Sequence, residues 1–295
     1  TQAKHENLVF SLLETNPPIP TWTWTSKEIT INNIVFGTSN SVVWKVTVNN
    51  TADYPVSFSM MMAVLPLATN ANLAPICSIQ SYKDGFVWVN GKPFVGTNIK
   101  PKTTGVGTLS RILSASLSGK VIKTSNFDSA ESKDGSSLWN YPVKLGSGEQ
   151  KDFHFVFPNS PSSKPPDINS SFDKQLSQAI SSWNQTFKSS QITVPDQAVQ
   201  DALNASLGYL LLSMDPDGPH PGPLAHDAVW IRDSAYTGLA LLQYGHHKLV
   251  RTTIEKTFAL RTGDSSENLY QSISDEVKWL EVKFGEIVIF NQALP

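Results

Sequence analysis

The sequence predicts a multi-domain protein with β and α parts, in which an N-terminal β-sandwich precedes a region built of helices. Three features indicate this order: alternating β-branched and aromatic residues before residue 160, a Pro/Ser-rich stretch over 158–166, and helical spacing of apolar residues after residue 170. The length of 295 residues suits about two domains. We therefore expect a β-sandwich over 1–160, a linker with a linker helix over 161–193 and a helical domain over 194–295.

The strands are predicted from alternation with a period of two residues. The clearest case is 42–48, where Val42, Trp44, Val46 and Val48 point to one face and the residues between them to the other. Many short strands separated by turns are typical of a β-sandwich. The other expected strands are 29–36, 56–64, 86–89, 92–95, 118–124 and 152–157.

A β-hairpin is predicted at Asn90-Gly91, between the strands 86–89 and 92–95. Asn-Gly supplies the two positive φ angles that a type I′ turn requires. Pro93 has no amide proton, so we expect it at a sheet edge or at a position that makes no ladder hydrogen bond.

Trp22 and Trp24 alternate with threonines over 21–25, as in a strand. Their rings then share one face of that strand. This face is either the edge of the core or a platform on which sugar rings stack, and the sequence leaves both interpretations open.

After residue 170 the apolar residues follow the period of a helix. Phe172, Leu176, Ile180 and Trp183 fall on one helical face. A second helix is expected to open at 194–196, Val-Pro-Asp, because proline is tolerated in the first turn and aspartate favours a helix N-terminus. The apolar stripe expected for this helix is Ala198, Ala202, Ala205, Tyr209 and Leu212. The proline-rich stretch 215–223 then predicts a rigid turn.

Composition excludes several classes of function. The chain has 23 basic and 25 acidic residues, a net charge of −2 and no Lys/Arg-rich run, so no nucleic-acid partner is expected. No apolar run reaches the ~18–20 residues of a membrane span, so no membrane partner is expected. Cys77 is the single cysteine, which rules out an internal disulfide and a cysteine-rich metal site. We expect neither a metal nor another cofactor.

The composition also indicates a location. Charged residues make up 16% of the chain, and Ser, Thr, Asn and Trp are abundant. Such surfaces suit neutral polar ligands such as sugars. We therefore expect an extracytoplasmic or secreted protein rather than a cytoplasmic one.

The segment 225–236, Ala-His-Asp-Ala-Val-Trp-Ile-Arg-Asp-Ser-Ala-Tyr, carries the most chemistry. A helical stripe follows it and ends at Gly245, so Asp233 is expected near a helix N-terminus, where free amides stabilise a carboxylate. Two interpretations remain open. In one, Asp233 is a helix cap, Arg232 a surface residue and Trp230 a core residue. In the other, Trp230 stacks on a sugar ring while Arg232 and Asp233 hydrogen-bond vicinal hydroxyls.

The stretch 226–236, with Gly-Leu-Ala-Leu-Leu behind it at 238–242, resembles the D-x-x-W-x-R-D-x-A-Y segment of the six-hairpin glycosidases. This superfamily includes the glucoamylase, glycogen-debranching amylo-α-1,6-glucosidase and processing α-glucosidase groups. The resemblance implies that the helical region opens an (α/α)6 toroid. It implies that Arg232 and Asp233 bind hydroxyls of the non-reducing sugar in the −1 subsite of an oligosaccharide substrate. The substrate-binding residues that it implies are His226, Asp227, Trp230, Arg232, Asp233 and Tyr236.

The chain is short for a complete toroid. About 130 residues follow the Pro/Ser-rich stretch 158–166, whereas twelve helices with ordinary loops need about 350–450 residues. In the relatives the general acid and general base follow later hairpins, so the resemblance implies that both lie outside this chain and leaves the catalytic residues unknown. The end of the sequence carries an amphipathic stripe, which fits a divergent hairpin or an unrelated ending. Its members are Leu269, Ile273, Val277, Leu280 and Phe284.

The expected function is hydrolysis of an α-glucosidic or related oligosaccharide, with this chain supplying the −1 subsite. By the resemblance, two carboxylates about 6.5–9.5 Å apart act with inversion. The alternative is a non-catalytic carbohydrate-binding or scaffold fragment of such an enzyme. One feature separates the two: hydrolysis by this chain requires a second carboxylate that faces Asp233 across a pocket.

Overall fold

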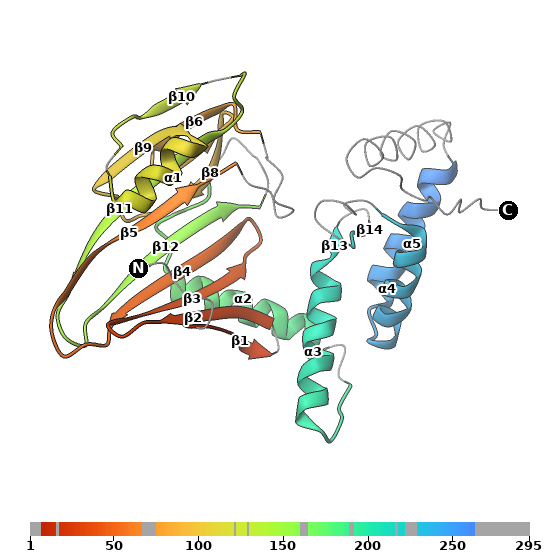
Figure 1. The fold of residues 1–295 in the computed structure, drawn as a ribbon. Helices are drawn as coiled ribbons and strands as arrows, with labels where there is room; N and C mark the ends of the chain where they lie inside the picture. Colours follow the sequence, from red (N-terminus) through yellow and green to blue (C-terminus); the bar gives the residue numbers. More distant parts are fainter. Residues whose placement is uncertain are drawn as a thin grey trace. The chain divides into compact units, whose positions relative to one another are not determined.

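The computed structural model describes residues 7–15, 18–66, 75–120, 122–128, 130–159, 165–188, 192–215, 218–221 and 229–262. By their internal contacts the residues form two units, Thr1–Glu14 with Ile19–Ser182 and Thr15–Pro18 with Trp183–Pro295 (Figure 1). We call them the first unit and the second unit. Strands dominate the first unit, and helices dominate the described part of the second. The domain boundaries expected from the sequence stay a prediction.

Most strands of the first unit belong to one nine-stranded sheet, in which neighbouring strands from β2 to β10 run antiparallel (Figure 1). Phe153 pairs with Val46 and Phe155 with Trp44, so alternate residues of adjacent strands share the inner face. In order across the sheet, the strands are β1 (Leu8–Thr15), β2 (Pro18–Thr25), β3 (Ile29–Gly37), β4 (Ser41–Asn50), β12 (Gln150–Pro158), β8 (Lys92–Gly96), β7 (Phe86–Val89), β6 (Ser78–Lys83) and β10 (Asn126–Asp128).

A second sheet of three antiparallel strands consists of β5 (Val56–Val64), β11 (Gly135–Leu145) and β9 (Thr103–Thr108), with β11 in the centre. Both sheets contribute to one apolar core, in which Trp139 and Phe153 are completely buried. This burial is the main stabilising contribution to the first unit. The strands expected at 29–36, 42–48, 56–64 and 152–157 are confirmed.

The hairpin predicted at Asn90-Gly91 is also confirmed. It joins β7 to β8, and both turn residues have positive φ, 49° for Asn90 and 78° for Gly91. These are the signs that a type I′ turn needs. Strand β8 also pairs with β12, and that pairing is at Gly96 and not at Pro93. The missing amide proton of Pro93 therefore interrupts no pairing with β12.

Trp22 and Trp24 lie on β2, and both are half-buried. The ring of Trp22 stacks on the ring of Trp44, with 6.2 Å between the centroids. Trp44 in turn packs against the core that the two sheets share. The position of Trp22 therefore agrees with the interpretation of this pair as the edge of the core.

The strand expected at 118–124 is wrong, because a helix occupies the start of that region. Helix α1 (Leu109–Ser118) begins where the Thr108 side chain accepts a hydrogen bond from the Arg111 amide, and it ends at Gly119 in the left-handed conformation with φ of 68°. Ile112 and Ala115 are buried on its inner face. The β-branched pair at 121–122 suggested a strand, but Gly119 ends α1 in the left-handed conformation and the described residues 122–124 belong to no strand.

Helix α2 (Phe172–Phe187) begins in the first unit, where it covers the outer face of β2, β3 and β4 (Figure 1). Phe172 and Ala179 are buried there, and Leu176 and Ile180 pack beside them. This is the face that the spacing of apolar residues predicts, so the helix expected there is confirmed, and its role as a linker stays a prediction. The last turn of α2, from Trp183, belongs to the second unit.

The second unit contains α3 (Gln197–Leu212), the short strands β13 (Met214–Asp215) and β14 (Gly218–Pro219), α4 (Ile231–Gln243) and α5 (His247–Thr262). Asp196 caps α3 by accepting hydrogen bonds from the Ala198 and Val199 amides, at 2.9 and 3.1 Å. Its core gathers Phe187, Leu207, Leu241 and Val250.

The helix expected after 194–196 is confirmed, and its apolar residues do not all face the core. Leu207 and Gly208 are the buried residues of α3, whereas Tyr209 and Leu212 are exposed. Apolar residues recur on more than one face of this helix, so their spacing did not identify the buried one. Between β13 and β14, the predicted turn is a hairpin whose residues 216 and 217 lie outside the described part.

Among the described helices, none is long and apolar enough to cross a membrane.

Candidate functional site

The candidate site lies at the start of α4. Trp230 is the residue before the helix and has extended backbone angles, with φ of −94° and ψ of 121°. Arg232 and Asp233 follow in the first turn, so Asp233 lies at a helix N-terminus as the sequence predicts. The Trp230 side chain makes no capping hydrogen bond to this end of the helix. The helix ends before Gly245, which has a φ of 82° and therefore stops α4 as expected.

Arg232 and Asp233 form an open ion pair. The Arg232 Nη2 and Asp233 Oδ2 atoms are 3.8 Å apart, and the side chains are 65% and 39% exposed. This distance is too long for a charge-assisted hydrogen bond, which requires about 2.7–2.9 Å. The guanidinium donors and the carboxylate oxygens thus remain available to a ligand.

Aromatic rings flank this pair along the helix. Tyr236 follows Asp233 by three residues and Arg232 by four, a spacing that places it on the same helical face. Its ring is 73% exposed, and Trp230 is also partly exposed. An exposed aromatic ring beside hydrogen-bonding groups is the combination that polyhydroxylated ligands use. The two remaining residues that the resemblance implies, His226 and Asp227, lie outside the described residues.

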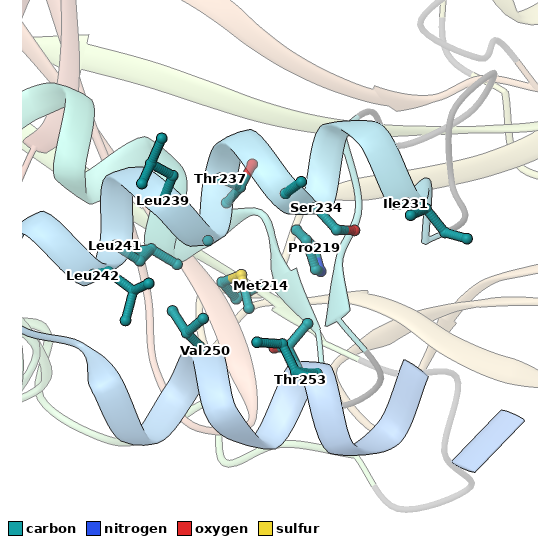
Figure 2. Close-up of a pocket in the computed structure, with 13 residues that line it drawn as sticks. Met214, Pro219, Ile231, Ser234, Thr237, Leu239, Leu241, Leu242, Val250 and Thr253 are labelled. Atoms are coloured by element: carbon teal, nitrogen blue, oxygen red, sulfur yellow. The ribbon is translucent and has the colours of Figure 1, made fainter. Parts of the chain in front are cut away.

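A cleft of about 390 Å³ lies on the other side of α4. Figure 2 shows α4 and α5 on either side of it, with Met214 and Pro219 between them. We call it the α4–α5 cleft. Its lining residues are Met214, Pro219, Ile231, Ser234, Ala235, Thr237, Gly238, Leu239, Leu241, Leu242, Val250, Thr253 and Ile254.

The α4–α5 cleft is apolar, and its lining includes neither a carboxylate nor any of the predicted sugar-binding residues. The one carboxylate of the first turn, Asp233, therefore lies outside it. Sequence reasoning missed this cleft, although Ala235, Leu239 and Leu242 recur at helical spacing behind the motif. That stripe indicated an apolar helix face and did not show that the described part of the chain leaves it uncovered.

Other titratable groups do not gather into a site within the described ranges. Burial lowers the pKa of His246, and Cys77 is half-buried. No group of three or more His, Cys, Asp and Glu side chains comes together among the residues that the structure describes.

Solved carbohydrate-active enzymes share this fold. One is described as a kojibiose phosphorylase from the human microbiome, with a TM-score of 0.51 and 11% identity over 82% of this chain and 34% of that chain. Another is a bacterial glucoamylase complexed with acarbose, with a TM-score of 0.60 and 13% identity over 85% of this chain and 41% of that chain. Neither a protein-family model nor a curated protein matches the sequence.

Both solved structures are members of the (α/α)6 glycoside hydrolase and phosphorylase superfamily. The resemblance found in the stretch 226–236 is thus confirmed at the level of the fold. The chain spans well under half the length of each of these two structures.

Proposed function

We propose that this chain is part of a glycoside hydrolase and that it supplies the −1 sugar-binding subsite for an α-glucosidic or related oligosaccharide. In this proposal a β-sandwich over 1–160 and a linker over 161–193 precede the opening helices of an (α/α)6 toroid over 194–295. The fold similarity to the glucoamylase and the kojibiose phosphorylase supports the proposal. An extracytoplasmic or secreted location belongs to the same proposal.

The observation that carries the proposal is the open Arg232–Asp233 pair on the first turn of α4. Vicinal sugar hydroxyls need a donor and an acceptor side by side, and adjacent Arg and Asp side chains provide both. The helix backbone holds these residues at a fixed offset, which a site that discriminates between epimers requires. Trp230 and Tyr236 provide apolar ring faces next to the pair. In the proposed site His226 and Asp227 support them.

The proposal assigns binding, and not proton transfer, to these residues. A salt-bridged aspartate bonded to sugar hydroxyls holds the substrate, while the general acid and general base belong to other parts of the enzyme. Inverting glycosidases place those two carboxylates about 6.5–9.5 Å apart. The lining of the α4–α5 cleft contains no such pair.

The same observation favours a second candidate, a non-catalytic carbohydrate-binding or scaffold fragment. Such a fragment needs the Arg232–Asp233 pair and needs no second carboxylate. Hydrolysis by the purified chain shows whether the catalytic carboxylates lie within it. We would incubate the chain with maltose, isomaltose, trehalose, kojibiose, nigerose and glycogen and measure the sugar released. Release from one substrate would place both carboxylates within 1–295 and exclude the non-catalytic fragment, whereas binding without release fits a chain that supplies only the sugar-binding subsite.

Asp233→Asn tests the binding role. We expect sugar affinity to fall at least about tenfold, because the amide loses the charge that strengthens hydrogen bonds to hydroxyls. The free energy of unfolding is expected to fall by less than about 1 kcal/mol, the size of a helix-dipole contribution. Isothermal titration calorimetry with the panel sugars and urea unfolding measure the two quantities.

Asp173→Asn is the matched control, because Asp173 is an exposed aspartate in the first turn of another helix, α2. It should leave sugar affinity unchanged. If Asp233→Asn destabilised the protein and kept full sugar affinity, the helix-capping interpretation would replace the sugar site.

A further inference from the structure

One edge of the nine-stranded sheet carries exposed apolar side chains. Strand β1 lies at the end of the described sheet, next to β2, and the Ser11 hydroxyl oxygen is 2.7 Å from that of Thr21 on β2 (Figure 1). On β1, Val9 is 64% exposed, Phe10 72% and Leu13 44%. Among the described strands, such exposure of a large apolar side chain occurs at one further position, on β8. Strand β1 therefore presents an apolar edge.

The other edges of the two described sheets lack this feature. At the opposite end of the nine-stranded sheet, β10 is three residues long and ends at the exposed Asp128. In the three-stranded sheet, the exposed residues of edge strand β5 are the small Ser57, Ser59 and Ala63. Short strands, charges and prolines are the means by which proteins keep sheet edges from pairing. The stretch 8–13 of β1 has neither a charge nor a proline.

The backbone of β1 is suited to a further strand. Along the outer side of an edge strand, amide and carbonyl groups have no partner in the sheet, and an added antiparallel strand pairs with them. Strand β1 has eight residues, which is enough for such a ladder of hydrogen bonds. Addition of a strand at a sheet edge is a common way in which proteins bind one another.

The sequence of β1 matches itself when two copies run antiparallel. A twofold axis perpendicular to the sheet at Ser11 keeps both faces continuous across the pair, because side chains alternate along each strand. Val9 then faces the partner's Leu13, and Phe10 faces the partner's Leu12. Apolar pairs across strands stabilise a sheet, whereas like charges that face each other destabilise it, and none meet in this stretch.

Pairing through β1 also closes the assembly. Each copy offers one such edge, and an antiparallel pair uses the edge of both copies, so the product is a dimer and not a fibre. A strand of an unrelated protein would meet the same edge without this symmetric match. A second copy of the chain is therefore the partner that the edge fits best.

We propose that the β1 strands of two copies of this chain pair antiparallel and join the two nine-stranded sheets into one. The interface is built from residues of the first unit and from none of the predicted sugar-binding residues. The proposal is thus independent of the proposed function.

The mass of the full chain in solution tests the proposal. Sedimentation velocity over about 1–100 μM, a range that detects moderate affinities, should show a shift from 32.4 kDa toward twice that mass as the concentration rises. Phe10→Lys should raise the dissociation constant at least about tenfold, because it replaces an apolar contact with a charge at the edge. Val9→Lys should act in the same way from the other face of β1.

Leu117→Lys is the matched control, because Leu117 is 75% exposed on a different element, α1, and the change adds the same charge. It should leave the dissociation constant unchanged. Circular dichroism and urea unfolding establish that each variant is folded.

A cysteine at the twofold axis identifies the paired element. Facing residues of an antiparallel pair have Cα atoms about 4.5–5.5 Å apart, which is within the range of a disulfide. With the native thiol removed by Cys77→Ser, copper phenanthroline should therefore oxidise the thiols of two Ser11→Cys chains to a disulfide. The Leu117→Cys chain in the same background should stay monomeric on a non-reducing gel.

Three outcomes overturn the proposal. A mass of 32.4 kDa at every concentration up to about 100 μM shows that the β1 edge does not join two copies. A dimer that both lysine variants leave intact is held by another surface. A dimer in which the Ser11→Cys thiols do not join lacks the antiparallel pairing of β1.

Discussion

Phe172 packs the start of α2 on the outer face of the nine-stranded sheet, and Phe172→Ala measures how much this packing adds to the free energy of unfolding. The side chain is 5% exposed. Its ring meets the ring of Phe36 edge-on at 5.3 Å and stacks on the imidazole of His154 at 5.2 Å. The Lys45 ammonium lies 5.0 Å from the centre of the same ring. Three elements, β3, β4 and β12, are thus joined to α2 by one side chain.

Removing this ring leaves a cavity between helix and sheet. Phe→Ala changes at buried sites cost about 3–5 kcal/mol. We expect about 3 kcal/mol here, because a residue at a helix end sits where the surroundings can relax. Urea unfolding followed by far-ultraviolet circular dichroism measures the loss. Phe94→Ala is the control, since Phe94 is exposed on β8 and its loss should cost less than about 1 kcal/mol.

A second measurement shows whether the loss arises at the proposed place. Burial lowers the pKa of His154, and the Phe172 ring contributes to that burial. Phe172→Ala should therefore raise the pKa of His154 toward its ordinary value, as followed by NMR titration. A loss below about 1 kcal/mol together with an unchanged His154 pKa would refute this account of α2.

Three further predictions follow from the same structure. The free energy of unfolding should fall as the pH drops below about 6.5. Burial and Lys45 lower the pKa of His154 although Asp152 and Asp173 act to raise it, so the unfolded chain binds the proton at a higher pH than the folded protein does. His154→Gln should therefore make the free energy of unfolding depend less on pH in this range. Asp196→Ala should cost about 1 kcal/mol in urea unfolding, because two amides at the start of α3 lose their acceptor, and an unchanged midpoint would contradict the cap. Gly96→Ala should cost about 1–3 kcal/mol because the new methyl group meets the Phe86 ring, whereas Gly37→Ala, with open space around it, should be tolerated.

The strands were predictable where apolar and polar residues alternate along the chain. In β4 the alternation of Val46 and Val48 with polar residues matches the alternation of buried and half-buried positions. The Asn90-Gly91 turn was predictable because few residue pairs adopt two successive positive φ angles. In each case the local sequence and the tertiary packing favour the same conformation.

Prediction failed where the local sequence allows two answers. Residues 118–124 contain a β-branched pair at 121–122 that suggests a strand. Gly119 instead lies in the left-handed conformation that ends α1, a helix held by the burial of Ile112 against β11. In α3, apolar residues lie on several faces, and only the packing of Leu207 against α4 and α5 decides which one is buried. Neither packing partner is near in sequence.

The two faces of α4 show how far sequence reasoning reached in the site. The motif led to Arg232, Asp233 and Tyr236, which share one face of the helix by their spacing. The cleft residues Ile231, Ala235 and Leu242 recur on the opposite face, and only the structure shows that they are uncovered by the described residues. Because successive helical residues are about 100° apart, a change on one face leaves the other face in place. Asp233→Asn should therefore lower sugar affinity while the packing of the opposite face is kept, so the free energy of unfolding should fall by less than about 1 kcal/mol. A larger loss of stability would show that the two faces of α4 are coupled.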